Sequence, residues 1–263
     1  MDIVRIVSNY FFHSDYNFIV DFETHKTEEG KKNILFLSGH DSPNKIRNLE
    51  NYDIIFANFV EHDKFKNIHY IPLGLAKQFN NIESFSLIPI RDRNINMFYC
   101  GCAHRNRLLF YNNFVEISKH IDNCEIKITK QNNPQEHIIE SNPSLFIKHI
   151  DYWEKLCNTK VHPICINAHS STAHDNYRYF ESIMTGTINI LAEKSIRENL
   201  WTYDYPLNVF IDSWREFTPE LVKNSIERLQ DTNIEESILS YRQKLSKHAI
   251  CSRIIDIIGS YEN

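Results

Sequence analysis

Apolar residues in this chain fall into short runs that are separated by longer stretches with helical periodicity. Runs rich in β-branched and aromatic residues are typical of buried strands, and they occupy residues 3–7, 33–37, 52–58, 69–71, 96–100, 125–129, 161–167 and 187–191. Apolar positions three and four apart predict helices at residues 108–120, 152–157, 176–185, 220–231, 235–246 and 250–261. This alternation predicts an α/β fold with parallel sheets that helices cover on both faces.

A charged, irregular stretch at residues 87–96 divides the pattern into two halves. We expect two Rossmann-like domains with parallel sheets: a reduced N-terminal domain at residues 1–88 and a C-terminal domain at residues 95–245. Residues 246–263 contain a last helix with one apolar face, which could pack back on the N-terminal domain.

The stretch NYRYFESIMTGTINI, residues 176–190, carries the most informative local pattern. Its apolar residues at helical spacing can face a core, and Gly186 is suited to end the helix with a positive φ. Arg178 and Glu181 are three positions apart and therefore lie on one side of this helix. The alternative is an ordinary solvated ion pair, which contributes about 0.2–0.5 kcal/mol.

A polar loop leads from the strand at 161–167 to this helix. Its candidate ligand-binding residues are Ser170, Ser171, Thr172 and, at the helix start, Asn176. Backbone amides at a helix start bind phosphate, and a carboxylate such as Glu181 can accept hydrogen bonds from ribose hydroxyls. The pattern therefore predicts a nucleotide site at the carboxyl edge of a sheet.

A second motif, CGCAHRNR at residues 100–107, follows the first strand of the second half. It places Arg105 and Arg107 beside a glycine turn at a helix start, where guanidinium groups can bind diphosphate oxygens in pairs. We favour Arg105 over Arg107, with Arg178 as a second contact. The alternative is that both arginines are solvated on an amphipathic helix.

Histidine and aspartate residues recur after apolar runs in the first half. The candidates for a general base are Asp15 and Asp41, with His13 and His40 as helpers; a similar pair stands at residues 62–63. Each follows an apolar run, so we expect each to lie at the carboxyl edge of the first sheet, where a base could reach a substrate hydroxyl.

The same residues leave two alternatives open. Clustered His and Asp could bind two metal ions in a phosphoesterase or another hydrolase, although no two histidines have the i, i+4 spacing of a helical metal site. A non-catalytic nucleotide- or sugar-binding module would keep Glu181 without turnover.

Composition restricts the class further. The 263 residues carry a net charge of −5 and no long basic run, which argues against nucleic acid as a partner. No apolar run reaches the 18–20 residues that a membrane span needs, and the N-terminus does not read as a signal peptide. Six cysteines without a regular spacing favour reduced thiols and a cytoplasmic protein.

Residues 152–190, with their Arg-x-x-Glu helix, Gly186 and following strand, resemble the signature region of exostosin-like glycosyltransferases. The stretch at 201–214, with the aromatic strand VFIDSW, fits the same family. The resemblance implies a GT-B architecture, with an acceptor domain followed by a nucleotide-sugar domain. It implies a glycosyltransferase that takes a sugar from a UDP-sugar, inverts its anomeric centre and needs no metal or other cofactor.

Residue roles follow from this resemblance. Glu181 would bind the ribose, while Arg105 and Arg178 would neutralise the diphosphate in place of a metal ion. Asp15 or Asp41 would deprotonate a hydroxyl of a glycan or glycoconjugate acceptor. Xylose and galactose are the donor sugars that we favour, since a pocket without a basic clamp for an acidic sugar would favour a neutral one.

Overall fold

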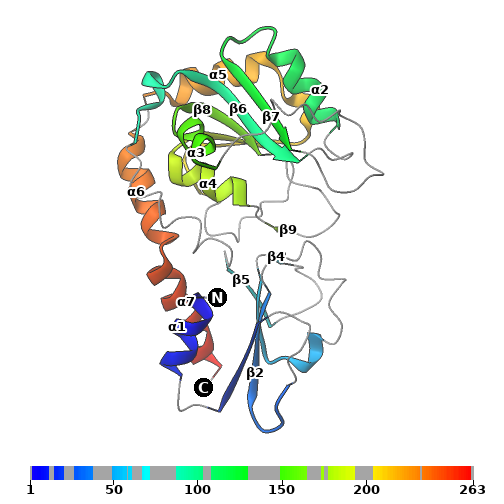
Figure 1. The fold of residues 1–263 in the computed structure, drawn as a ribbon, viewed down its shortest axis with the longest axis vertical. Helices are drawn as coiled ribbons and strands as arrows, with labels where there is room; N and C mark the ends of the chain where they lie inside the picture. Colours follow the sequence, from blue (N-terminus) through cyan, green and yellow to red (C-terminus); the bar gives the residue numbers. More distant parts are fainter. Residues whose placement is uncertain are drawn as a thin grey trace.

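The protein contains two parallel sheets, one in each half of the chain, with helices packed around them (Figure 1). The structure is a computed structural model, and it describes residues 2–11, 15–20, 27–37, 49–57, 59–60, 67–71, 87–102, 108–129, 149–164, 173–174, 177–192, 204–231 and 233–261. Among these residues, no helix is both long enough and apolar enough to cross a membrane.

The N-terminal sheet has the strand order β1-β2-β3-β5, and every pair of neighbours is parallel. Its strands are β1 (Tyr16–Val20), β2 (Lys32–Leu37), β3 (Ile54–Ala57) and β5 (Ile68–Tyr70). Phe36 and Phe56 stack across adjacent strands with ring centroids 5.1 Å apart. The continuous burial of β2 and β3 is typical of parallel strands that are covered on both faces.

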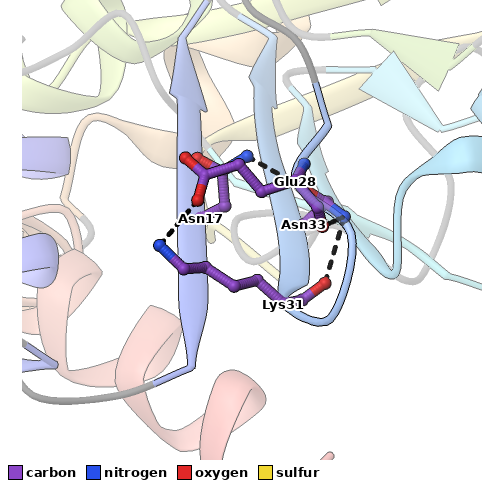
Figure 2. A network of polar contacts seen from close by, with 4 residues as sticks. All are labelled: Asn17, Glu28, Lys31 and Asn33. Atoms are coloured by element: carbon purple, nitrogen blue, oxygen red, sulfur yellow. Dashed lines mark hydrogen bonds and ion pairs between the residues drawn. The ribbon is translucent and has the colours of Figure 1, made fainter.

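Asn33 organises the turn that leads into β2 (Figure 2). Its Oδ1 accepts hydrogen bonds from Asn17 Nδ2 at 2.8 Å and from the Glu28 amide at 2.9 Å. Its Nδ2 donates to the carbonyls of Glu28 and Lys31 at 3.2 and 3.1 Å. Gly30 has a φ of +81°, a conformation that favours glycine. One buried amide therefore sets the start of two strands at the amino edge of this sheet.

The C-terminal sheet has the order β11-β10-β8-β6-β7 and is also wholly parallel. Its strands are β6 (Ile95–Cys102), β7 (Cys124–Thr129), β8 (Thr159–Ile164), β10 (Ile188–Ala192) and β11 (Asn208–Ile211). Helices α3 (His149–Cys157) and α4 (Tyr177–Thr185) pack together and against β8, whereas α2 (Leu108–Ile117) packs against the short helix η7 (Trp214–Glu216) that precedes α5 (Pro219–Leu229). The chain crosses from β6 to β7 in one direction along the sheet and from β8 to β10 in the other. Because such crossovers are right-handed, α2 and α4 lie on opposite faces of the sheet.

The first and the last helix of the chain pack against each other beside the N-terminal sheet (Figure 1). Helix α6 (Ile234–Lys244) leads from the C-terminal domain into α7 (Lys247–Ser260), which packs on α1 (Asp2–Tyr10). The Tyr261 hydroxyl lies 2.8 Å from His69 Nε2, and Lys32 Nζ donates to the Tyr261 carbonyl. The last helix therefore joins the two domains.

A second connection is a two-stranded antiparallel sheet. Strand β4 (Phe59–Val60) follows β3 closely, and β9 (Ala173–His174) lies between β8 and α4 in the chain. Because β4 follows the carboxyl end of β3 and β9 follows the carboxyl end of β8, their pairing turns the carboxyl edges of the two sheets toward each other.

Most of the predicted elements are present within one to four residues of the expected bounds. The predicted strand at 3–7 is wrong, because these residues form α1. Ile3 and Val7 are buried while Arg5 and Ile6 are exposed, which is the i, i+4 period of a helix; a five-residue run is too short to distinguish the two periods. The sequence reasoning also missed β1, β4 and β9.

Candidate functional site

The candidate site lies at the carboxyl edge of the C-terminal sheet, where the strand order reverses. In this sheet β6 and β8 are neighbours. After β6 the chain continues to β7 on one side, whereas after β8 it continues to β10 on the other side. In open α/β sheets such a switch point opens a crevice between the two following loops, and ligands bind there.

Three side chains from α3 and α4 meet at this edge. The Tyr152 hydroxyl donates to Glu181 Oε2 at 2.6 Å, and Arg178 Nη1 donates to the same oxygen at 2.8 Å. The Arg178 guanidinium carbon also lies 4.3 Å from the centroid of the Tyr152 ring. Both hydrogen bonds end on Oε2, which leaves Oε1 as an acceptor within the part of the chain that the structure describes.

This cluster is not the solvated ion pair of the alternative interpretation. The Glu181 side chain is 4% exposed and that of Arg178 is 35% exposed. Burial acts to lower the pKa of Arg178, but the neighbouring Tyr152 and Glu181 act against it and the pKa rises above its ordinary value. Burial, reinforced by Glu181, raises the pKa of Tyr152 well above its usual range. The site therefore holds a permanent cation and a neutral hydroxyl donor.

His162 and Phe98 line the sheet beneath this cluster. Their rings stack with centroids 6.3 Å apart. His162 is fully buried, and neither ring nitrogen has a hydrogen-bond partner among the described residues. Burial and, secondly, the charge of Arg178 lower the pKa of His162 to about 3. Because His162 is neutral, it does not add to the positive charge of Arg178.

A buried polar network fixes the orientation of α4 on the sheet. Ser182 is hydrogen-bonded to Thr187 and Asn189. Asn189 Nδ2 donates to Asn208 Oδ1 at 3.1 Å, and Asn208 Nδ2 donates to the Tyr179 hydroxyl at 2.9 Å. Directional bonds of this kind specify helix rotation more narrowly than apolar packing does, so Arg178 and Glu181 are held toward Tyr152.

The structure brings together two of the predicted donor residues, Arg178 and Glu181. The other predicted site residues lie outside the described residues: His13, His40, Asp41, Arg105, Arg107, Ser170, Ser171, Thr172 and Asn176. In the chain, the loop with the two arginines follows β6 and the loop with the hydroxyl residues follows β8. These are the two strands that flank the switch point.

The expectation that Asp15 lies at the carboxyl edge of the first sheet is wrong. Asp15 immediately precedes β1, its carbonyl accepts from the Lys32 amide at 2.8 Å, and it is exposed. It therefore lies at the amino edge, away from the β4–β9 connection. The error follows from the assignment of 3–7 as a strand, which made Asp15 appear to follow a strand.

Two residues of the site were not predicted. The sequence predicts that Tyr152 lies on a helix but assigns it no role. The only feature that could have indicated one is an aromatic hydroxyl in the helix that leads into β8. His162 lies within an apolar strand and has no signal in the sequence, since only the tertiary structure shows that its ring nitrogens have no hydrogen-bond partner among the described residues.

Metal-binding side chains do not gather in the described part of the chain. No group of three or more His, Cys, Asp and Glu residues within it could hold a metal ion. His40 and Asp41, on which the hydrolase alternative depends, lie outside it. Cys124, Cys157 and Cys251 are free thiols.

Comparisons with known proteins identify the fold. No family model and no curated protein matches the chain. An alpha-glucosyltransferase solved with UDP and a 13-mer DNA containing an A:G mismatch aligns over 98% of this chain and 84% of its own, with a TM-score of 0.57 and 13% identity. A second alpha-glucosyltransferase structure, with UDP-glucose and DNA containing an abasic site, has a TM-score of 0.53, 11% identity and the same coverage. The chain has the GT-B fold.

The likeness extends over both domains and confirms the predicted fold class. In the GT-B fold, two Rossmann-like domains face each other, and here the β4–β9 pair joins the segments that follow the carboxyl ends of β3 and β8. The comparisons give no specific support to the exostosin-like family.

Proposed function

We propose that this protein is a metal-independent glycosyltransferase that transfers a sugar from a UDP-sugar to a hydroxyl group. The observation that carries the proposal is the buried Glu181 carboxylate in the middle of α4, paired with Arg178 of the first turn, at the switch point of a GT-B fold. A carboxylate held there, whose Oε1 accepts no hydrogen bond from the described residues, suits the ribose of a nucleotide.

Charge stabilisation of the leaving diphosphate would come from arginine. Arg178 is charged, partly exposed and located in the first turn of α4, where a helix end also favours anions. Arg105 and Arg107, in the loop that follows β6, would supply further bidentate contacts. Ser170, Ser171, Thr172 and Asn176 would bind the remaining phosphate oxygens. These groups would do the work of a metal ion.

Inversion at the anomeric centre requires a base in the N-terminal domain. Asp41, with His40 as helper, follows β2 in the chain, and the carboxyl ends of that sheet face the donor domain. We therefore favour Asp41 over Asp15, which lies at the opposite edge. The sugar would be a neutral one such as xylose or galactose.

A hydroxyl of a glycan or glycoconjugate is the acceptor that we favour. Duplex DNA is the second candidate, since the two alpha-glucosyltransferase structures hold DNA. Against it, acidic residues outnumber basic ones in the first 88 residues and in the whole chain, whereas DNA binding depends largely on Lys and Arg contacts to phosphate.

Calorimetric titration with UDP, first with EDTA and then with Mn²⁺, tests the donor site directly. We expect UDP to bind equally in both conditions and GDP to bind more weakly. A hydrolysis screen of UDP-sugars would then name the donor, and parallel assays with oligosaccharides and duplex DNA would separate the two acceptors. A folded protein that binds no nucleotide in either condition would contradict the proposal.

A further inference from the structure

The carboxyl end of α4 is held by two arginines, one from α6 and one from the linker that precedes β6. Arg242 of α6 donates from Nε and Nη2 to the Met184 carbonyl, at 2.9 and 2.7 Å. Arg93 donates from Nη2 to the Thr185 carbonyl at 2.9 Å. The last carbonyls of a helix have no partner within the helix, and positive charge at this end is favourable. The two guanidinium groups therefore cap the helix that carries Arg178 and Glu181.

Arg93 is committed to this position. Its side chain is buried, and its other bonds go to the Ile88 carbonyl at 2.8 Å and the Thr159 carbonyl at 2.7 Å. Burial lowers the pKa of Arg93 to about 10, so the residue stays charged at neutral pH. A buried cation that is bonded to three backbone carbonyls ties the linker to β8 and α4 at once.

Each arginine belongs to a segment that crosses between the domains. Arg93 ends the linker that leads into β6, and Arg242 lies in α6, which continues into α7 on the N-terminal domain. The third crossing, the β4–β9 pair, lies just before the start of α4. These three connections between the domains therefore lie at or next to α4.

A cavity separates part of the linker from α6. It has a volume of about 320 Å³ and is lined by linker residues such as Pro89 and Arg91 and by α6 residues such as Ile234 and Ile238. Arg93, in contrast, is bonded to β8 and α4. A change in the angle between the domains would move the linker and α6. Because Arg93 and Arg242 are bonded to the last carbonyls of α4, this movement would shift α4 as well.

We propose that Arg93 and Arg242 are positioning residues for the donor site, which couple the position of α4 to that of the N-terminal domain. The inference rests on the proposed function. The helix has nine residues and spans about 13 Å, so donor contacts at one end and the arginine clamp at the other act on a single rigid element. Ligand binding at the start of α4 would then favour one arrangement of the domains, by the usual reciprocity of coupled equilibria.

Replacing Arg242 tests this coupling in the full-length protein. We expect Arg242→Met to weaken UDP binding about fivefold or more and to reduce the UDP-induced decrease in the radius of gyration, measured by small-angle X-ray scattering at saturating UDP. Arg242→Lys, which keeps the charge with fewer donors, should be intermediate. Arg228→Met, at an exposed arginine of α5, is the matched control and should behave as wild type.

The scattering measurement separates positioning from simple destabilisation, because every variant is compared at full occupancy by UDP. If Arg242→Met binds UDP and becomes compact as the wild type does, the inference is overturned but the proposed function is not. The same conclusion follows if the wild type binds UDP without any change in scattering. A wild-type protein that binds no UDP would overturn the proposed function, and the inference with it. Should Arg242→Met fail to fold, Arg242→Lys carries the same comparison.

Discussion

Tyr152 and Glu181 are 29 positions apart in the chain and share a buried hydrogen bond of 2.6 Å. The bond joins α3 to α4, and the Tyr152 ring also contacts the guanidinium of Arg178. One side chain thus holds both proposed donor-binding residues before any ligand arrives. Preorganisation of this kind reduces the cost of ordering a site when a ligand binds.

Glu181 should dominate nucleotide affinity. Glu181→Gln removes the charge but keeps the size, and we expect UDP to bind about 10-fold to 100-fold more weakly, since hydrogen bonds to a charged group contribute about 1.5–3 kcal/mol. Calorimetry measures this directly. Glu227→Gln, at an exposed position of α5, is the control. Equal UDP affinities in the two variants would show that Glu181 does not bind the nucleotide.

Tyr152→Phe isolates the hydroxyl from the ring. The variant keeps the stacking on Arg178 and loses one donor to a buried carboxylate, so we expect a loss of about 1–3 kcal/mol in the free energy of unfolding and weaker UDP binding. Urea denaturation and calorimetry check the two effects. Tyr10→Phe, at a largely exposed tyrosine, should change neither; an unaltered Tyr152→Phe would mean that the bond is incidental.

His162 should make the protein sensitive to acid. Its pKa is about 3 in the folded protein, against 6.5 for the ordinary group, so only the unfolded chain takes up the proton between these values. The contribution of neutral His162 to the free energy of unfolding is therefore complete above pH 6.5. It decreases as the pH falls, by up to about 1.4 kcal/mol per pH unit. Burial also lowers the pKa of His69, which adds a smaller effect of the same sign.

Urea denaturation of His162→Phe at several pH values between 7.5 and 4.5 tests this. We expect the variant to be at least as stable as wild type, because it removes two buried nitrogens that have no hydrogen-bond partner in the described part of the chain. We also expect its stability to depend less steeply on pH. His248→Phe, at an exposed histidine, should keep the wild-type slope. If the slope of His162→Phe is also unchanged, another group causes the acid sensitivity.

Gly186 cannot be replaced without loss. It has a φ of +69°, and a Cβ there would lie 2.0 Å from Ile238 Cδ1. Gly186→Ala should therefore destabilise the protein by about 2 kcal/mol or more. Gly259→Ala is the contrasting control: it lies inside α7 with nothing within 4 Å of a Cβ and should stabilise by about 0.5–1 kcal/mol. Thermal unfolding compares the two, and equal effects would contradict the close packing of α6 on α4.

The two aspartates should differ in activity. Asp41→Asn should lower kcat by about 100-fold or more while UDP binding persists, as expected when a general base is lost. Asp15→Asn should retain near wild-type activity, because Asp15 lies at the amino edge of its sheet. Initial rates with the identified UDP-sugar decide this, and a large loss in Asp15→Asn alone would reverse our assignment.

The α/β class and most of the elements could be predicted because they depend on local periodicity. The helix that ends at Gly186 and the strand after it are present as predicted. Local pattern failed where the run was short, at 3–7, and where strands of two residues form only by pairing with a distant partner, as in β4 and β9.

The sequence by itself determined that Arg178 and Glu181 share one side of a helix between two strands, since three residues span most of a helical turn. Only the tertiary structure decided that Glu181 is buried against Tyr152, that His162 lies beneath them with no hydrogen-bond partner among the residues that the structure describes, and that Asp15 lies at the amino edge of its sheet. The reason is physical: spacing along a helix is a local property, whereas burial and proximity depend on which distant segments the chain packs against it.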